Sequence, residues 1–252
     1  MGNGTFVSHE SKLIAVTGAS RGIGAAIAVE LARRGFRVAC LTRKGAGPEV
    51  EAAAHFEASF VNHACDVNDE DSVRAALEAV GRNGLHGLVN NAGIHLDAPS
   101  HELDTATYER VMQTNATAVF TASREAYPHL VAAGGGTIVN IGSFFDKIGV
   151  KRNLAYCASK AAVGAITRCL AVEWASKGIR VLDVAPGYVV TDLNREALES
   201  GPVRDYIDKR IPGRRPGTAE EIARLVAGIF SEDIPFLTGE TIYIDGGQGI
   251  AH

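Results

Sequence analysis

The chain has 252 residues, of which 46% are hydrophobic and 21% are charged, and its formal net charge at pH 7 is −4. A chain of this length and composition can bury a full hydrophobic core. The nearly neutral charge gives no electrostatic reason to expect a nucleic acid partner. No stretch approaches the run of about 18 apolar residues that a membrane span requires. The four cysteines lie far apart in the sequence, which favours free thiols and a cytoplasmic location.

Short β-branched runs alternate with helical patterns along almost the whole chain, which predicts an α/β fold. We expect a Rossmann-like, doubly wound sheet of about seven parallel strands, all buried, with helices on both faces. Strands are predicted over residues 13–17, 37–41, 60–64, 87–90, 137–141, 179–184 and 241–244. Helices are predicted over residues 24–34, 49–57, 70–80, 105–132, 154–176 and 219–230.

No linker, charge block or internal repeat divides the sequence, so we expect residues 1–252 to form a single domain with a polar N-terminal tail over residues 1–11. Between residues 191 and 215 the pattern becomes irregular and rich in proline and glycine. Ligands of open α/β sheets bind beyond the carboxyl ends of strands, so this segment could form a substrate lid. An ordinary surface excursion is the alternative.

A glycine-rich turn follows the first predicted strand and precedes the first predicted helix. It reads Thr17-Gly18-Ala19-Ser20-Arg21-Gly22-Ile23-Gly24. In this context Gly18 permits a sharp turn, Gly22 lets the backbone approach a phosphate, and Gly24 lets the helix lie close to the sheet. The turn therefore predicts a dinucleotide pyrophosphate at the helix N-terminus, although a purely structural turn is the alternative. The expected contacts are Gly18, Ser20, Arg21, Gly22, Ile23 and Gly24.

The end of the second strand indicates which dinucleotide is bound. It carries Thr42-Arg43-Lys44 and lacks the acidic residue that would hold the ribose 2′-hydroxyl of NAD. Basic side chains here, together with Arg21, would neutralise a 2′-phosphate, so we predict NADP (NADPH) over NAD, with Thr42 and Arg43 as contacts. The alternative is that these charges only face solvent. After the third strand, Asp66-Val67 could meet the adenine, or Asp66 could begin the next helix.

A tyrosine and a lysine lie four residues apart in the predicted helix over residues 154–176, and so share one helix face. A neighbouring ammonium lowers the pKa of a phenol, which makes Tyr156, beside Lys160, a candidate general acid and base. Ser143 ends the fifth strand, where its hydroxyl could hold a substrate oxygen. Either signal alone is weak, because such pairs occur by chance and a serine often caps a turn. Both fall where the dinucleotide is expected.

These patterns together resemble those of the short-chain dehydrogenase/reductase family over essentially the whole chain. The matches are Thr17-Gly18-x-x-x-Gly22-x-Gly24, Asn90-Asn91-Ala92-Gly93, Ser143, Tyr156-x-x-x-Lys160 and Pro186-Gly187-Tyr188-Val189-Val190-Thr191. The resemblance implies a catalytic group of Asn115, Ser143, Tyr156 and Lys160, in which Asn115 holds a water that relays protons to the lysine. It also implies further cofactor contacts: Asn91, Ala92, Gly93, Tyr156, Lys160, Pro186, Gly187, Val189 and Thr191.

The implied reaction interconverts a ketone and a secondary alcohol by hydride transfer with NADP(H), and needs no metal. The substrate site is expected to contain Ser143, Phe144, Phe145, His95 and Tyr188, although the two phenylalanines could instead pack in the core. This mostly apolar lining favours a moderately hydrophobic small molecule. The resemblance further implies a homo-oligomer, a dimer or a homotetramer, paired through the two long helices.

Two alternatives remain. Residues 237–247 resemble the ending of the 3-oxoacyl-[acyl-carrier-protein] reductases, but residues 131–137 carry no positive charge to dock an acidic carrier. We therefore expect a general ketone and alcohol oxidoreductase, with acyl-carrier reduction as the nearest alternative. A non-catalytic NADP-binding sensor is the alternative from another class. It would tolerate loss of the tyrosine or the lysine, and this chain has both.

Overall fold

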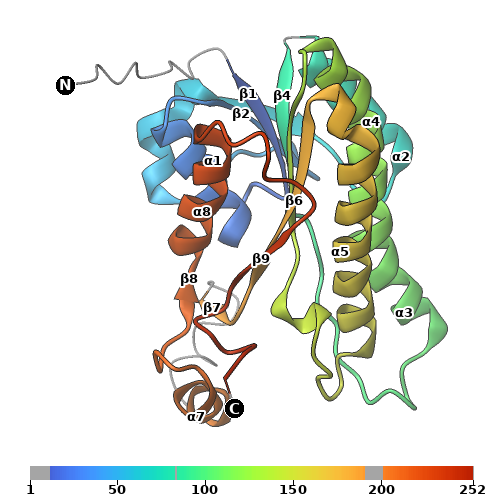
Figure 1. The fold of residues 1–252 in the computed structure, drawn as a ribbon, viewed down its shortest axis with the longest axis vertical. Coiled ribbons are helices and arrows are strands. Elements are labelled where there is room, and N and C mark those ends of the chain that lie inside the picture. Colours follow the sequence, from blue (N-terminus) through green and yellow to red (C-terminus); the bar gives the residue numbers. More distant parts are fainter. Residues whose placement is uncertain (1–11, 83, 191–200, 252) are drawn as a thin grey trace.

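The protein is described by a computed structural model over residues 12–82, 84–190 and 201–251 (Figure 1). Seven parallel strands form one sheet in the order β3-β2-β1-β4-β5-β6-β9. They are β1 (Leu13–Thr17), β2 (Arg37–Thr42), β3 (Phe60–Ala64), β4 (Leu85–Asn90), β5 (Gly136–Ile141), β6 (Ile179–Pro186) and β9 (Thr241–Ile244). The short strands β7 (Val189–Val190) and β8 (Gly217–Thr218) form a second sheet. The predicted Rossmann-like architecture is confirmed.

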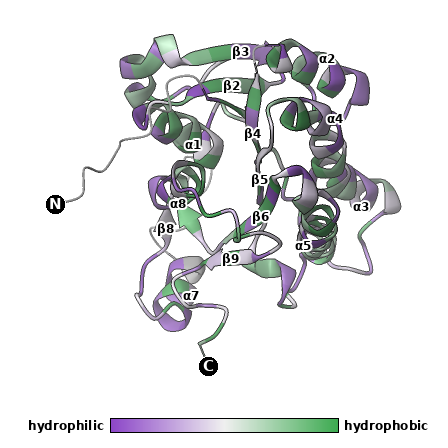
Figure 2. Ribbon diagram, turned by 45° about the horizontal axis from the view of Figure 1, so that its top comes forward, coloured by the Kyte–Doolittle hydropathy of each residue, from purple (hydrophilic) through white to green (hydrophobic). Residues whose placement is uncertain are grey.

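Helices cover both faces of the sheet (Figure 1; Figure 2). One face carries α1 (Gly22–Arg33) and α8 (Ala219–Ser231), which pack against each other. The other face carries α2 (Glu70–Gly81), α4 (Ala118–Ala132) and α5 (Leu154–Trp174). The remaining helical segments are η1 (Glu51–Ser59), α3 (Thr105–Met112), η2 (Gln113–Thr117), η3 (Phe144–Asp146), η4 (Ala175–Lys177) and α7 (Pro202–Arg210).

Each face of the sheet has its own hydrophobic core. Leu31 of α1 and Val226 of α8 pack with Leu182 of β6 on one face. Leu130 of α4 packs with Val181 of β6 on the other. Neighbouring residues of a strand point to opposite faces, so a sheet covered on both sides needs strands that are apolar throughout. This requirement explains why the strands could be recognised as short β-branched runs.

The expectation that all seven strands are buried is wrong for the two outer ones. In β3 the residues Asn62 and Ala64 are exposed, and β9 has no fully buried residue. An outer strand has a neighbour on only one side, so its far edge meets solvent. Within the sheet, β1 pairs with both β2 and β4, and the chain order reverses between β1 and β4. Ligands of such folds bind beyond the strand ends at this reversal.

Three predicted helices differ from those observed. The helix expected over residues 105–132 is two α-helices joined by the wide turn of η2, because Asn115 in this turn bonds to the backbone of a distant loop. The helix expected over residues 49–57 is a 3-10 segment interrupted at Phe56, whose φ and ψ of −130° and 18° are not helical. The helix that begins at Leu154 ends at Trp174, two residues early.

Some sequence predictions fall on residues outside the described part of the chain. These are the tail over residues 1–11 and the first part of the expected lid, residues 191–200, which includes Thr191. The described remainder of that segment forms α7, where Ile207 and Ile211 are buried against Tyr188 and Val190. In the described ranges, we find no helix with the length and apolarity needed to cross a bilayer.

Candidate active site

The glycine turn after β1 is too tightly packed for larger residues. Gly18 and Gly22 have left-handed φ values of 66° and 57°. A Cβ on Gly24 would lie 2.3 Å from the carbonyl oxygen of Gly18, closer than any real contact. Only glycine meets both demands, the left-handed backbone and the close approach of α1. The turn therefore leaves open backbone at the N-terminus of a helix, which suits a phosphate group.

Asn91 fixes this turn to the neighbouring strand. Its Nδ2 donates to the carbonyl oxygens of Thr17 at 3.0 Å and of Gly18 at 3.3 Å. The backbone N–H groups of Asn91 and Ala92 both donate to Thr17 Oγ1, at 3.0 and 3.1 Å. These bonds join the carboxyl ends of β1 and β4, the two strands at the reversal of the sheet order. Asn91 thus shapes the turn as well as bordering it.

A pocket of about 820 Å³ opens beside the turn. The predicted cofactor residues that line it are Gly18, Ser20, Arg21, Gly22, Ile23, Gly24, Thr42, Arg43, Asp66, Val67, Asn91, Ala92 and Gly93. It is also lined by Leu41, Glu49, Cys65, Asn68, Ile94, Arg110, Gln113 and Thr114, which the sequence analysis missed. Leu41 lies near the carboxyl end of the apolar strand β2, and Cys65 directly follows β3, positions at strand ends that could have identified them. Glu49 and Arg110 lie on segments without such a signal.

The predicted cofactor residues of the second half of the chain do not line this pocket. They are Tyr156, Lys160, Pro186, Gly187 and Val189. Pro186 ends β6, and Val189 lies in β7 with an exposure of 7%. Gly187 lies against the C-terminal segment, since a Cβ there would be 2.7 Å from Asp245 Cα. These residues continue along the carboxyl edge of the sheet, beyond the pocket itself.

The basic side chains near the end of β2 are available to a ligand. Arg43 and Arg21 are exposed and form no ion pair with the residues that the structure describes. The Thr42 hydroxyl is used locally, since it donates to the Ala46 carbonyl at 2.9 Å and accepts from its N–H at 2.8 Å. Two positive charges therefore face the pocket, and neither has an ion-pair partner among the described residues.

Asp66 does not begin the following helix, which excludes that alternative. The N-cap of α2 is Asp69, whose side chain accepts the N–H of Asp71 at 3.1 Å. Asp66 uses its Oδ1 within a turn, where it accepts the N–H of Asn68 at 3.0 Å. Its second oxygen makes no hydrogen bond with the described residues, so it is available to a donor in the pocket.

Ser143, Tyr156 and Lys160 meet at the carboxyl end of β5. Ser143 follows that strand, accepts the N–H of Phe145 at 3.2 Å, and is hydrogen-bonded to the Tyr156 phenol. Tyr156 lies in the first turn of α5. Lys160 Nζ is 5.6 Å from the centre of the Tyr156 ring and donates to the Ile141 carbonyl at 2.7 Å. The spacing of four residues does place phenol and ammonium on one face of the helix.

Burial controls the acid–base properties of this group. Burial raises the pKa of Tyr156, and the hydrogen bond with Ser143 opposes that rise. Burial also lowers the pKa of Lys160 to about 8, against the opposing effect of the Asp183 carboxylate. The net pKa of Tyr156 is therefore raised in this arrangement, and the expectation that Lys160 makes this phenol more acidic stays a prediction. Desolvation of the phenol dominates, and the ammonium is bonded to a backbone carbonyl instead of the phenol oxygen.

Asn115 is fully buried and links two parts of the site. Its Oδ1 accepts the N–H of Ile94 at 2.8 Å, and its Nδ2 donates to the Ile94 carbonyl at 2.9 Å and to Ser159 Oγ at 3.1 Å. The Ser159 hydroxyl in turn donates to the Tyr156 carbonyl at 2.8 Å. The side-chain amide of Asn115 therefore joins the loop after β4 to the helix turn that carries Tyr156.

Aromatic side chains surround Tyr156. The centroid of its ring lies 4.8 Å from that of His95 and 5.9 Å from that of Phe145. Phe144 extends the wall toward Tyr188, at 5.6 Å. Phe144 and Phe145 are only 2% and 9% exposed, so they pack in the interior while they form one side of the site. The structure thus places His95 and Phe145 against the Tyr156 ring, and Phe144 and Tyr188 continue the same aromatic cluster.

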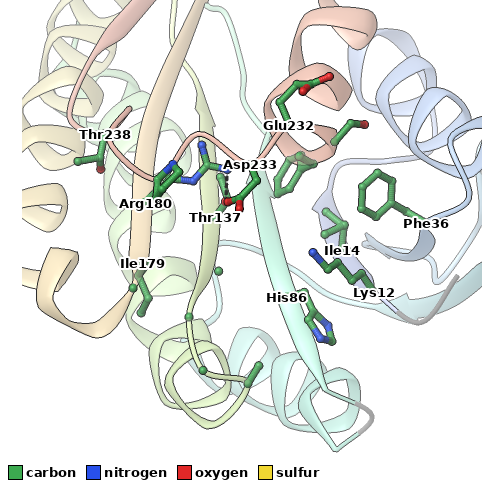
Figure 3. Close-up of a pocket in the computed structure, with 18 of the residues that line it drawn as sticks. Lys12, Ile14, Phe36, His86, Thr137, Ile179, Arg180, Glu232, Asp233 and Thr238 are labelled. Atoms are coloured by element: carbon green, nitrogen blue, oxygen red, sulfur yellow. Dashed lines mark hydrogen bonds between the residues drawn. The ribbon is translucent and has the colours of Figure 1, made fainter. Parts of the chain in front are cut away.

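A second pocket, of about 670 Å³, lies at the opposite, amino end of the sheet (Figure 3). Lys12 and Arg180 give it positive charge, His86 contributes an imidazole, and Asp233 contributes a carboxylate. The Arg180 guanidinium is already engaged, since it donates to Thr137 Oγ1 and to the carbonyl of residue 229, both at 3.0 Å. The pocket has neither a glycine turn at a helix N-terminus nor a coupled acid and base. The candidate site therefore lies at the carboxyl end.

Comparison with known proteins identifies the family of the chain. Residues 18–248 match the family model described as enoyl-(acyl carrier protein) reductase. D-Threitol dehydrogenase from Mycolicibacterium smegmatis is 36% identical over 247 residues, which cover 96% of this chain and 94% of that protein. The chain belongs to the short-chain dehydrogenase/reductase family. This dehydrogenase/reductase is accordingly an oxidoreductase of the class that acts on CH–OH groups.

Other relatives of this dehydrogenase/reductase are named for different substrates. Acetoacetyl-CoA reductase from Rhizobium meliloti is 37% identical over 247 residues, 96% of this chain and 100% of the relative. A solved structure from Beutenbergia cavernae, described as an NAD(P)-dependent gluconate 5-dehydrogenase, superimposes with a TM-score of 0.86. It is 32% identical, the match covers 94% of this chain and 96% of that one, and it holds NADP at low occupancy. The relatives thus share the fold and differ in the substrates that they are named for.

Proposed function

We propose that this protein interconverts a ketone and a secondary alcohol with NADP(H), and that Tyr156 is the general acid and base. The hydrogen-bonded pair of Ser143 and Tyr156, with Lys160 beside it at the carboxyl end of β5, carries this proposal. The glycine turn that would hold the dinucleotide lies along the same edge of the sheet. The pocket residues fit such a group, because the close approach at Gly24 leaves bare backbone for a pyrophosphate.

Ser143, Tyr156 and Lys160 have different roles in the proposed reduction. A bound nicotinamide supplies the hydride. Ser143 donates a hydrogen bond to the carbonyl oxygen of the substrate and holds it beside Tyr156. Tyr156 then protonates that oxygen, and the positive charge of Lys160 stabilises the phenolate that remains. The raised pKa of Tyr156 keeps the phenol protonated near neutral pH, so we expect reduction there and oxidation only at higher pH.

The preference for NADP(H) rests on Arg43 and Arg21. Both are exposed at the pocket and lack an ion-pair partner among the described residues, so they can bind a 2′-phosphate. Glu49 also lines the pocket, but it forms no ion pair with either arginine. The relative with bound NADP supports the same choice.

The surroundings of Tyr156 support a small, moderately hydrophobic substrate. Phe144, Phe145 and Tyr188 form an apolar wall, and His95 offers a polar group against the Tyr156 ring. Such a lining suits a ketone with an apolar substituent better than a phosphorylated sugar.

We further propose that the chain folds as one domain and forms a homo-oligomer, a dimer or a tetramer, through α4 and α5. Phe120 of α4 and Val172 of α5 are large apolar side chains with exposures of 42% and 82%. A second copy of these helices would cover them. Light scattering in solution tests this directly, since the monomer mass is 26.5 kDa. The cytoplasmic location stays a prediction from the free cysteines.

A panel of ketones and secondary alcohols, assayed with NADPH and with NADH, tests the proposed reaction. We expect saturable NADPH oxidation with at least one ketone, and a KM for NADPH at least about tenfold below that for NADH, which is about 1.4 kcal/mol of binding. Binding of NADPH without turnover on any ketone would favour the sensor. Reduction of an acyl-carrier substrate far faster than its small thioester analogue would favour the carrier-dependent alternative.

A further inference from the structure

A row of polar side chains crosses the sheet beneath α4 and α5. The register places Asn90, Asn140, Asp183 and Thr241 side by side on β4, β5, β6 and β9. Asp183 is fully buried and is the one member of this row that can carry a charge. Burying a charge is costly unless the charge has a partner. The presence of an ionisable side chain at this buried position therefore has to be explained, whereas the neutral residues beside it need no such explanation.

Hydrogen bonding alone does not explain the carboxylate. Asn90 donates to Asn140 Oδ1 at 2.9 Å, and Asn140 donates to Thr167 Oγ1 at 2.8 Å, so neutral groups satisfy that part of the row. Asp183 Oδ2 accepts from Thr241 Oγ1 at 3.2 Å, and the backbone of Gly142 also favours the ionised carboxylate. Its Oδ1 is buried and has no hydrogen-bond partner among the described residues. An asparagine would serve equally well if only hydrogen bonds were needed, so the charge itself must matter.

The positive charge that acts on the pKa of Asp183 is that of Lys160. Burial lowers the pKa of Lys160, and the carboxylate of Asp183 opposes this. Burial raises the pKa of Asp183 to about 6, and the ammonium of Lys160 opposes that rise. Near neutral pH each group therefore favours the ionised form of the other.

Asp183 also lies directly behind the strand end that presents Ser143. A Cβ on Gly142 would lie 2.4 Å from Asp183 Oδ1, so only a glycine leaves room for the carboxylate. The residue before this glycine, Ile141, accepts the hydrogen bond from Lys160, and the residue after it is Ser143. One carboxylate thus borders the backbone segment that holds both the lysine and the serine.

Other titratable groups also lie around Asp183. In the described part of the chain they are Lys160 and Arg168 from α5, Asp146 from η3 and Tyr243 from β9. Asp146 carries the same charge as Asp183 and raises its pKa. Asp146 is itself bonded to the Tyr243 hydroxyl at 2.8 Å. Lys160 is the positive group that opposes burial of the Asp183 charge most strongly.

We propose that Asp183 is a positioning residue for the reaction: its carboxylate keeps the Lys160 ammonium charged and bonded at the strand end that presents Ser143. This inference rests on the proposed function, because it assumes that Lys160 acts on Tyr156. Without the charge of Asp183, Lys160 loses its proton at a lower pH. The phenolate of Tyr156 then lacks its stabilising charge at a pH where the unaltered enzyme still works.

Titration of Lys160 by NMR tests the proposal without any need for turnover. The protein is labelled with carbon-13 at lysine Cε, and the Lys160 signal is assigned by its loss in Lys160→Arg. In the unaltered protein we expect a main inflection at about 8 and a smaller one near 6, where Asp183 titrates. In Asp183→Asn the smaller inflection should vanish and the main one should fall by about one pH unit.

Glu173→Gln is the matched control, because Glu173 is an exposed carboxylate on the same helix. It should leave the Lys160 titration unchanged. If Asp183→Asn does not fold, Thr241→Val, which removes the hydrogen bond to Asp183 Oδ2, should produce a smaller shift in the same direction. A Lys160 pKa that stays within about 0.2 unit in the folded variant overturns the proposal.

The pH profile of kcat/KM for ketone reduction gives a second readout. In Asp183→Asn its alkaline limb should move to lower pH by the same amount as the NMR inflection. A variant that is only less stable would lose activity at every pH without this shift. If the unaltered protein reduces no ketone, the proposed function fails, while the NMR titration still decides whether Asp183 controls the charge of Lys160.

Discussion

The two ends of the sheet offer pockets of similar size, about 820 Å³ at the carboxyl end and about 670 Å³ at the amino end. Both contain arginine side chains. At the carboxyl end Arg43 has no ion-pair partner among the described residues. At the amino end Arg180 already donates hydrogen bonds to the Thr137 hydroxyl and the Ile229 carbonyl. Volume alone therefore does not identify a site. A site is identified by polar groups that the fold holds in place without giving them hydrogen-bond or ion-pair partners.

The largest expected effect is a loss of turnover when the Tyr156 hydroxyl, at the carboxyl end of the sheet, is removed. Tyr156→Phe keeps the ring against Phe145 and removes the transferable proton, so turnover should fall by about 10²- to 10⁴-fold. The dissociation constant for NADPH, measured by fluorescence titration, should change by less than about twofold, since no phosphate contact is touched. Tyr127→Phe, which lies against Trp174 away from the site, is the control. Retained turnover in Tyr156→Phe would reject Tyr156 as the acid.

The second largest effect is expected from removal of the Arg43 guanidinium at the carboxyl end of the sheet. Arg43→Ala should raise the KM for NADPH by about 10- to 100-fold, because it removes a charge-assisted contact with the 2′-phosphate. The KM for NADH and both kcat values should stay nearly unchanged. Arg37→Ala, an exposed arginine at the amino end of the same strand, provides the control. Equal losses with NADPH and NADH would show that Arg43 does not read the 2′ position.

At the amino end we expect an effect on stability without one on activity. Arg180→Ala leaves the buried Thr137 hydroxyl and the carbonyl of residue 229 without their donor, which should cost about 1–3 kcal/mol in the free energy of unfolding. Urea denaturation measures this loss. The value of kcat/KM at 25 °C should stay within about twofold of that of the unaltered protein. A selective loss of turnover in a stable variant would mean that the amino-end pocket takes part in function.

The smallest effect is a dependence of stability on pH at the start of α8. The Arg215 guanidinium and the Thr218 backbone hold the pKa of Glu221 at about 2, below its ordinary value of 4.5. A lowered folded-state pKa adds stability above pH 4.5 that disappears as the pH falls toward 2. Because the pair is partly exposed, Glu221→Gln should cost only about 1 kcal/mol at pH 7. Unfolding curves at pH 7 and pH 3 should show that this difference shrinks; a constant difference would contradict the assignment.

Local signals made the dinucleotide end predictable from the sequence. The glycines of the turn are required by backbone geometry within eight residues, and apolar runs identify the strands on either side. The predicted strands and pocket residues of the first half of the chain therefore fall where the structure places them. Long-range contacts were not predictable. The wide turn at Asn115 depends on a bond to Ile94, 21 residues away, which helical periodicity does not reveal.

The same limit applies to the chemistry of the site. The spacing of Tyr156 and Lys160 correctly predicted one shared helix face. The pKa of Tyr156, however, depends mainly on burial, and that of Lys160 depends on burial and on Asp183, which lies on a distant strand. Glu49 and Arg110 reach the pocket from segments that carry no motif. A pattern along the chain reports what the backbone must do locally. It does not report which distant charges the folded chain brings together.

The contact between Gly24 and Gly18 has an evolutionary consequence. A side chain at position 24 would collide with the backbone of the turn, whereas the guanidinium of Arg43 makes no ion pair in the described part of the chain. Descendants of this sequence can thus exchange one dinucleotide for the other through changes at the end of β2. The turn between β1 and α1, which under the proposed function would bind the pyrophosphate common to both dinucleotides, must keep its glycines.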